Sequence, residues 1–331
     1  RAHASPPLKP GPWITATAVQ YAANDELQEL QKQAMRFFQE ARASRTRMAY
    51  DHDWRLFERW CQRHGQLPLP ASASLLALYL THMAQLGRKA STIRRARIAI
   101  GQVHGAAGLP RPDQNDRIRS VERGIGRSLG THEESAAPIS VDDLERMVRP
   151  LQRNSVRDDR DRALLLLGFA GAFRASDLVV LDVEHISFGD SVLIVHVPRS
   201  KEDQMARGRV TQIPFAANPN LCAAGALRRW MERVGRDGPL FRVVHGGRVE
   251  HQRIHPRTVS RAVQRAATRV GIEQKYSAHS LRSGLATAAF AQGATDRDIQ
   301  MHGRWKDLRS LDRYIRLAAI PNRRNVVTGL L

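Results

Sequence analysis

Five residues in the second half of the chain have the side chains that cleavage of a phosphodiester without a metal ion would require. Two arginines can bracket a phosphate, a lysine can protonate the leaving oxygen, a histidine can assist, and a tyrosine can attack the phosphorus. In chain order these residues are Arg174, Lys201, His279, Arg282 and Tyr314. Attack by a tyrosine hydroxyl on a phosphodiester is therefore the hypothesis against which the rest of the sequence is weighed.

Arg174 lies in the segment Gly171-Ala-Phe-Arg-Ala-Ser-Asp-Leu178, directly after an apolar stretch that predicts a helix. The glycine and the small residues permit a sharp turn there. Asp177 follows three residues after Arg174, a spacing at which its carboxylate can orient the guanidinium group. An Arg-x-x-Asp pair on its own is more often a structural salt bridge, so this pair supports a catalytic role only together with the other candidate residues.

Lys201 lies in a polar turn between two β-rich stretches, 192–197 and 210–214, which predict a hairpin. A lysine on such a turn can project into a groove and donate a proton, although most hairpin lysines only protect a strand edge. Arg199 and Arg207 are the neighbouring alternatives.

If Ser277 begins a helix, His279 and Arg282 lie on one face of it, one turn apart. Both side chains would then converge on one phosphate near the positive end of that helix. A single histidine is more often an ordinary core or surface group, so the pairing with Arg282 carries the prediction.

Tyr314 follows Trp305 by nine residues and is flanked by Arg313 and Arg316. Neighbouring positive charges favour the phenolate form of a tyrosine. Trp305 offers a single indole N–H and a large packing surface. His302 is the other candidate for a supporting ring, but it lies twelve residues before Tyr314, so Trp305 is preferred.

The elements that must hold these residues divide the chain into two domains after a short lead-in. Residues 1–22 are predicted to be a flexible N-terminal segment, residues 23–129 an all-helical domain, and residues 130–138 a polar linker ending in proline. Residues 139–331 are predicted to be mostly helical with one small antiparallel sheet and a C-terminal tail from about 317.

Apolar periodicity and capping residues place the individual helices. Ser44, Ser72 and Ser140 are expected to begin helices. The expected helical ranges are about 25–41, 44–64, 71–86, 90–104, 116–129, 158–170, 219–234, 256–270, 279–292 and 295–301, with a further helix that begins at Ser140.

Basic residues dominate the charge balance. Lys and Arg number 52 against 32 acidic residues, which gives a formal net charge of +20. Both halves of the chain are basic, and this suits a protein that grips a polyanion from two sides, although a generally basic proteome is the alternative. The residues expected to contact DNA are Arg45, Arg47, Arg88, Lys89, Arg94, Arg95, Arg97 and Arg199. A solvated basic face is the commoner meaning of such a charge run.

The remaining composition excludes several classes of protein. Cys61 and Cys222 are far apart and are expected to be reduced. No apolar stretch approaches the ~20 residues that span a bilayer, and residues 1–12 lack an apolar signal core. We expect a cytoplasmic protein without a membrane partner, associated with the nucleoid when bound to DNA.

Two further patterns predict no cofactor site. His245, His251 and His255 fall in a glycine-rich stretch without the carboxylate or cysteine pattern typical of a metal site, so no metal is predicted. Gly124-x-Gly126 is not preceded by a β-strand and therefore does not predict a nucleotide-binding loop.

Taken in order, the motifs resemble the tyrosine recombinase (phage integrase) family. That family has an arginine in R-x-x-[ED]-L, a hairpin lysine, H-x-x-R, a His or Trp, and a tyrosine nine residues later. The matching residues here are Arg174 with Asp177 and Leu178, Lys201, His279 with Arg282, Trp305 and Tyr314. The likeness extends over about 25–325. Trp305, the Ile-Arg pair after Tyr314 and Gly-Leu-Pro-Arg-Pro at 108–112 look closest to the Cre-like branch. Arg304 is a departure, because the family often has glycine there.

The resemblance implies a two-domain DNA clamp, with a helical core-binding domain and an α+β catalytic domain that closes on duplex DNA. It implies cleavage through a 3′-phosphotyrosine, with Arg174, Lys201, His279, Arg282 and Trp305 assisting Tyr314, and no cofactor. The implied partners are double-stranded DNA with inverted-repeat sites, further copies of this chain as a tetramer on DNA, and optional accessory DNA-bending proteins. The tail after 317 and the first helix would contact neighbouring copies.

Two other classes of protein stay open. A type IB topoisomerase would use nearly the same catalytic residues but should relax plasmids without a defined site. A DNA-binding regulator without catalytic activity would explain the charge and the helices, but not the spacing of the catalytic set.

Overall fold

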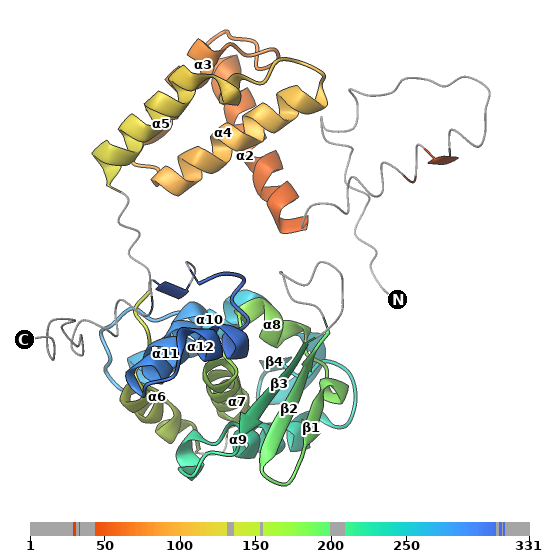
Figure 1. The fold of residues 1–331 in the computed structure, drawn as a ribbon. Coiled ribbons are helices and arrows are strands. Elements are labelled where there is room, and N and C mark those ends of the chain that lie inside the picture. The colour runs from red at the N-terminus through yellow and green to blue at the C-terminus, as the bar shows by residue number, and fades with distance from the viewer. Residues whose placement is uncertain are drawn as a thin grey trace, which may run out of the picture. The chain divides into compact units, whose positions relative to one another are not determined.

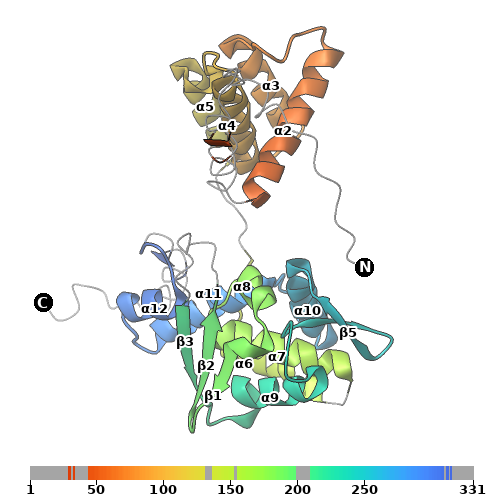
Figure 2. The same ribbon diagram turned by 90° about the vertical axis from the view of Figure 1, so that its right-hand side faces the viewer.

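The computed structural model describes residues 29, 30, 33, 44–130, 136–152, 155–198, 209–308, 311, 312 and 314. The chain divides into two compact units, Arg1–Glu133 and Glu134–Leu331, and the division falls inside the segment predicted to be a linker. Figures 1 and 2 show the two units as ribbons. Each unit is described by itself below.

The described part of the first unit is helical, as the sequence predicts. It contains α2 (Ser44–Arg63), α3 (Ala73–Gln85), α4 (Ala90–Ala106) and α5 (Asp116–Leu129), with a short 3₁₀ turn at Pro112–Gln114. Ser72 caps α3 by accepting a hydrogen bond from the Leu75 N–H, at 3.1 Å. The predicted helix at 25–41 lies largely outside the described residues.

Aromatic side chains form the core of the first unit. Phe57 on α2 lies with its ring centroid 5.0 Å from that of Tyr79 on α3, and Trp60 lies 5.3 Å from Tyr79. His104, which is fully buried on α4, accepts a hydrogen bond from the Ala71 N–H at its Nε2. Its Nδ1 therefore carries the proton and donates to the carbonyl of Ile100, at 2.8 Å. The ring thus joins α4 to the loop that leads into α3.

The second unit is a helical body with small sheets, which confirms the predicted fold class. Its helices are α6 (Val141–Val148), α7 (Val156–Ala170), α8 (Ala175–Val180), α9 (Ala223–Val234), α10 (Pro256–Arg269), α11 (Ala278–Ala291) and α12 (Asp296–Gly303), with 3₁₀ turns at Arg149–Gln152, Val183–His185 and Pro219–Leu221. Helix α7 packs against α9, α10 and α11. Its residues 159–169 are buried on every side, so it forms the centre of the unit.

The predicted hairpin is the centre of a three-stranded antiparallel sheet, with β1 (Ile186–Phe188), β2 (Val192–Val197) and β3 (Arg209–Pro214) in that order. Val195 pairs with Thr211, and the sheet lies at one edge of the helical body (Figures 1 and 2). Leu193 and Val195 point into the core, while the alternate residues of β2 are more exposed, as the period of a strand requires.

The prediction of one sheet was wrong. Among the described residues a second antiparallel pair is formed by β4 (Arg242–His245) and β5 (Arg248–Arg253). The stretch that looked like a glycine-rich loop is therefore a hairpin. Gly246 and Gly247 form its turn with φ angles of 53° and 79°, the left-handed conformation that tight hairpin turns require. The polar residues of β5 gave no alternating pattern that would have predicted the strand.

Candidate active site

Arg174 is the N-cap residue of α8 and follows a tight turn that begins at Gly171. A Cβ atom at Gly171 would lie 2.1 Å from the ring of Phe173, so the turn requires a glycine at that position. Asp177 is buried, with 1% of its surface exposed, and its Oδ2 accepts the Arg174 N–H at 3.2 Å. The same oxygen lies 4.0 Å from Nη1 of Arg174. Asp177 therefore contacts both the backbone and the side chain of Arg174.

His279 and Arg282 share the first turns of α11, as the sequence predicts. Ser277 caps the helix by accepting the His279 N–H at 3.2 Å. Arg282 is 1% exposed, and its Nη1 donates to the Ala172 carbonyl at 2.5 Å. A buried guanidinium is stable only where it has such partners. Arg282 is thereby attached to the turn that presents Arg174.

Trp305 and Tyr314 lie together in an apolar cluster with Ala172, Ala286 and Ile299. Their ring centroids are 6.1 Å apart, and each side chain is less than a tenth exposed. The guanidinium carbon of Arg282 lies 3.9 Å from the centroid of the Trp305 ring, which is a cation–π contact. The indole ring of Trp305 therefore packs against both Arg282 and Tyr314.

The hydroxyl of Tyr314 and Nε2 of His279 share a short hydrogen bond. The two ring centroids are 5.6 Å apart. An imidazole in this position can accept the hydroxyl proton, and that is the arrangement required to activate a tyrosine as a nucleophile. A buried cation, Arg282, contacts the same Trp305 ring that packs against Tyr314. Contacts thus join four predicted site residues: His279, Arg282, Trp305 and Tyr314.

The competing candidate His302 is placed differently. It lies in the last turn of α12, and its Nε2 is hydrogen-bonded to the Ala170 carbonyl at the end of α7, at 2.7 Å. Trp305, in contrast, contacts both Arg282 and Tyr314. The geometry favours Trp305 as the ring that supports the site.

Several predicted residues lie outside the described part of the chain. They are Lys201 with its alternatives Arg199 and Arg207, and the tail from 317. The strands on either side of the predicted lysine turn are described, and Val197 pairs with Arg209. Lys201 thus belongs to a segment that joins two paired strands, and its role as a proton donor stays a prediction.

The arginines of α4 form ion pairs within the first unit. Nε of Arg95 donates to Oδ2 of Asp53 at 2.7 Å, and this hydrogen bond raises the pKa of Arg95. Arg94 and Arg97 both reach Glu122, each at 2.7 Å.

The other residues expected to contact DNA are described less fully. Arg88 and Lys89 precede α4 and are exposed, and Arg47 is partly buried on α2. Nothing is described of the Arg45 side chain. DNA contact by these residues stays a prediction.

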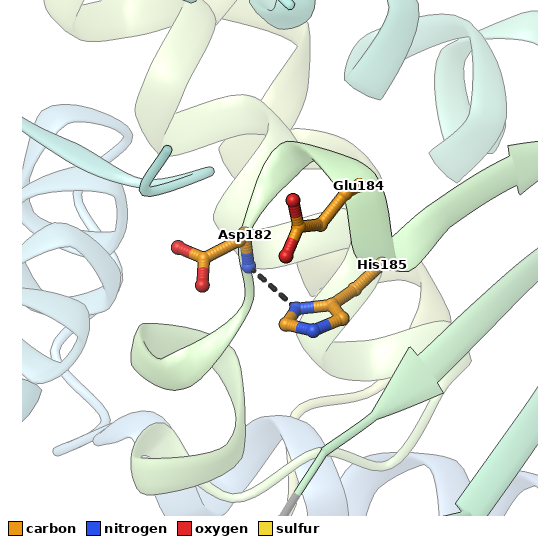
Figure 3. Close-up of side chains that lie close together, drawn as sticks. All are labelled: Asp182, Glu184 and His185. Carbon is orange, nitrogen blue, oxygen red and sulfur yellow. Dashed lines mark hydrogen bonds between the residues drawn. The ribbon is translucent and has the colours of Figure 1, made fainter. Parts of the chain in front are cut away.

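One group of metal-ligand side chains occurs among the described residues, formed by Asp182, Glu184 and His185 with their ligand atoms within 4.8 Å of one another (Figure 3). Nδ1 of His185 accepts the Asp182 N–H at 2.9 Å. Asp182 also pairs with Arg253 at 2.5 Å. Asp182 and His185 thus form the capping box of the 3₁₀ turn at Val183–His185, and the cluster carries no metal proposal.

The histidines considered for a metal site in the sequence have other partners or other roles. His255 caps α10 by accepting the Arg257 N–H at 3.1 Å. His251 lies on β5, 3.5 Å from Nη1 of Arg242, and His245 ends β4.

None of the described helices is long and apolar enough to cross a bilayer.

Solved structures define the class of fold. The chain is similar to the Tn1549 transposon integrase in complex with transposon right end DNA, with a TM-score of 0.57 and 15% identity over 82% of this chain and 89% of that chain. It is also similar to XerH site-specific recombinase bound to difH substrate, with a TM-score of 0.58 and 12% identity over 80% of this chain and 74% of that chain. The fold is that of these recombinases.

Sequence comparison gives the family. The phage integrase family matches residues 139–319. An integrase/recombinase xerD homolog from Selenomonas ruminantium is 31% identical over 87% of this chain and 86% of its own length. The chain belongs to the phage integrase family. Recombinase cre of Escherichia phage P1 is 24% identical over 82% of this chain and 86% of its own length, so the Cre-like branch receives weaker support than the family.

Proposed function

We propose that this chain is a site-specific DNA recombinase that breaks and rejoins DNA strands through a covalent phosphotyrosine intermediate. The relatives named as recombinases support this function. The observation that carries the assignment to particular residues is the hydrogen bond between Tyr314 and His279 beside the Arg282–Trp305 contact. Arg282 is in turn attached to the Arg174 turn.

In the proposed reaction, Oη of Tyr314 attacks the scissile phosphate while His279 accepts its proton. The P–O bond to the 5′ oxygen breaks, which leaves a 3′-phosphotyrosine and a 5′-hydroxyl, and Lys201 supplies the proton to that leaving oxygen. Arg174 and Arg282 neutralise charge on the non-bridging oxygens. Attack by the 5′-hydroxyl of a partner strand reverses these steps. One phosphodiester is exchanged for another, so no nucleotide cofactor is consumed.

The buried position of Arg282 suits its role. A guanidinium held by the Ala172 carbonyl and the face of Trp305 has little freedom to reorient as charge develops on the phosphate. Fixed donors of this kind cost no reorganisation during the reaction. Asp177 gives Arg174 a comparable constraint from the N-terminal turn of α8.

The proposed substrate is double-stranded DNA with inverted-repeat sites, bound as a tetramer of this chain with accessory DNA-bending proteins as optional partners. The helical first unit and the basic α4 would contribute the second half of a clamp. The tail from 317 would dock on a neighbouring copy. Removal of the chain from Leu317 onward should abolish cooperative assembly on DNA, and unchanged cooperativity would contradict this part of the proposal.

The test of the function is an SDS-resistant protein–DNA adduct. Purified protein is incubated with DNA from the genomic surroundings of its own gene, and adducts are resolved by denaturing electrophoresis. Wild type should form an adduct at a defined site, and Tyr314→Phe should form none. The matched control is Tyr276→Phe, because Tyr276 is also a buried tyrosine of this unit and donates to Asp143 at 2.6 Å, outside the site.

The same assay separates the other classes of protein. An adduct of equal yield with Tyr314→Phe would remove Tyr314 as the nucleophile. Relaxation of any supercoiled plasmid without site preference would assign a type IB topoisomerase activity instead. Specific DNA binding without an adduct from the wild type would indicate a regulator.

A further inference from the structure

Arg304 combines two features that are each costly for an arginine. It follows α12 with backbone angles φ 59° and ψ 45°, the left-handed region that a glycine adopts without penalty. For an arginine this conformation costs roughly 1–2 kcal/mol. The residue is also only 5% exposed, so its charge requires partners inside the protein. An arginine kept in such a position is expected to make contacts that a glycine cannot.

Those contacts reach three separate segments of the second unit. Nη1 of Arg304 donates to Oγ1 of Thr211 on β3 and to the His302 carbonyl at 3.3 Å. Nη2 donates to the Gly171 carbonyl at 2.8 Å. The guanidinium carbon also lies 4.4 Å from the ring centroid of Phe173. One planar group therefore ties β3, the end of α12 and the turn that precedes Arg174.

The Gly171–Ala172 turn is held by two guanidinium groups. The Gly171 carbonyl accepts from Arg304, and the next carbonyl, that of Ala172, accepts from Arg282. Arg304 is adjacent in sequence to Trp305, whose ring covers Arg282. The turn that presents Arg174 is thus fixed from both sides by donors on different elements.

We propose that Arg304 is a positioning residue for strand cleavage, which fixes β3 and the Gly171–Ala172 turn relative to each other so that Arg174 meets the phosphate. This inference rests on the proposed recombinase function. The guanidinium group of Arg304 links Thr211 to Gly171, which precede Arg304 in the sequence by 93 and 133 residues. Lysine cannot replace it, because a single ammonium cannot bind Thr211 and Gly171 in the same geometry.

The test is single-turnover adduct formation at saturating protein, together with DNA affinity and thermal unfolding of the full chain. Arg304→Lys should lower the cleavage rate by about ten- to a hundred-fold, because small misplacements of positioning groups cost that much. DNA affinity should change by less than about three-fold, since no DNA contact is removed. A merely structural role would instead lower the folded fraction without lowering the rate of the molecules that stay folded.

Arg162→Lys is the matched control. Arg162 is also a buried arginine of this unit, and it donates to two backbone carbonyls, those of Val148 at 2.7 Å and Asn220 at 2.8 Å. Its substitution should lower the melting temperature and leave the single-turnover rate of the folded protein unchanged. An equal loss of rate in Arg162→Lys and Arg304→Lys would overturn the positioning role.

Thr211→Val keeps the test decisive if Arg304→Lys does not fold. The substitution retains the shape of the side chain and removes only the acceptor on β3, so it should slow cleavage in its own right. If both variants fold, the double variant should cleave DNA no more slowly than Arg304→Lys alone, because both substitutions break the same contact between Arg304 and Thr211. Wild-type rate in Thr211→Val would overturn the inference while adduct formation by the wild type still supports the recombinase function. Absence of a wild-type adduct would instead overturn the function itself.

Discussion

Replacement of Gly284 by alanine tests how closely α11 packs against the segment that leads into α6. Gly284 lies on α11, two residues after Arg282, where the chain at Ile139 crosses the helix. The Ile139 N–H donates to the Ser280 carbonyl at 3.1 Å, which holds the crossing segment against the helix. A Cβ atom at Gly284 would lie 2.3 Å from the Ile139 carbonyl oxygen and 2.9 Å from Cε2 of Phe169. The first contact is with backbone, so it cannot be relieved by a rotamer change.

The expected cost follows from two opposing effects. Overpacking a well-filled site costs about 1–3 kcal/mol, and a clash with hydrogen-bonded backbone belongs at the upper end of that range. Alanine in a helix interior is favoured over glycine by about 1 kcal/mol. Gly284→Ala should therefore reduce the free energy of unfolding by about 2 kcal/mol. For a unit of this size that corresponds to a melting temperature about 4–8 °C lower.

The measurement is thermal unfolding of the full chain, with hydrogen exchange of the α11 amides to localise the effect. Gly225→Ala is the matched control, because Gly225 is an exposed helical glycine of the same unit. Its added Cβ would meet only Cys222 Sγ and Cβ, at 3.8 and 3.9 Å. That variant should be unchanged or slightly more stable. A Gly284→Ala protein that melts at or above the temperature of Gly225→Ala would refute the inferred close approach.

Two other predictions concern titratable groups. Burial lowers the pKa of His104 below its ordinary value of 6.5. The neutral His104 ring therefore stabilises the folded state fully above about pH 6.5, and this stabilisation is lost as the pH falls below that value. Denaturant unfolding at pH 7.5 and 5.5 should show this acid loss, and His104→Gln should show a smaller one; an equal loss would contradict the assignment. Burial raises the pKa of the Cys61 thiol to about 11, whereas Cys222 is half-buried. A thiol reagent at pH 8 should label Cys222 in the folded protein and Cys61 only after unfolding, and equal labelling rates would argue against the packing around Cys61.

Local signals predicted much of the fold because the interactions behind them are local. Ser72 and Ser140 cap α3 and α6 by accepting hydrogen bonds from N–H groups three residues away, so the capping pattern can be recognised within a short stretch of sequence. The strand at 192–197 was found at its observed bounds because its apolar run is β-branched. The second hairpin was missed because β5 is polar and only Gly246–Gly247 marks its turn.

The residue types of the candidate site could be predicted from the sequence, but the long-range contacts between them could not. The order of Arg174, His279, Arg282 and Tyr314 in the sequence pointed to one chemistry, but not to the hydrogen bond between Tyr314 and His279, which lie 35 residues apart. Arg304 was visible only as a departure from the family pattern. Its partners lie too far along the chain for any spacing rule to connect them.

The ion pairs of α4 bear on how much of the net charge is available to a nucleic acid. The affinity of a protein for DNA falls with salt in proportion to the counterions that its cations displace from phosphates. Arg94, Arg95 and Arg97 already face the carboxylates of Asp53 and Glu122. For these arginines a phosphate would replace one anion with another, so a formal charge of +20 overstates the number of counterions released on binding. Asp53 and Glu122 would therefore compete with phosphates for these cations, and any DNA binding through α4 would depend on salt less steeply than the formal charge implies.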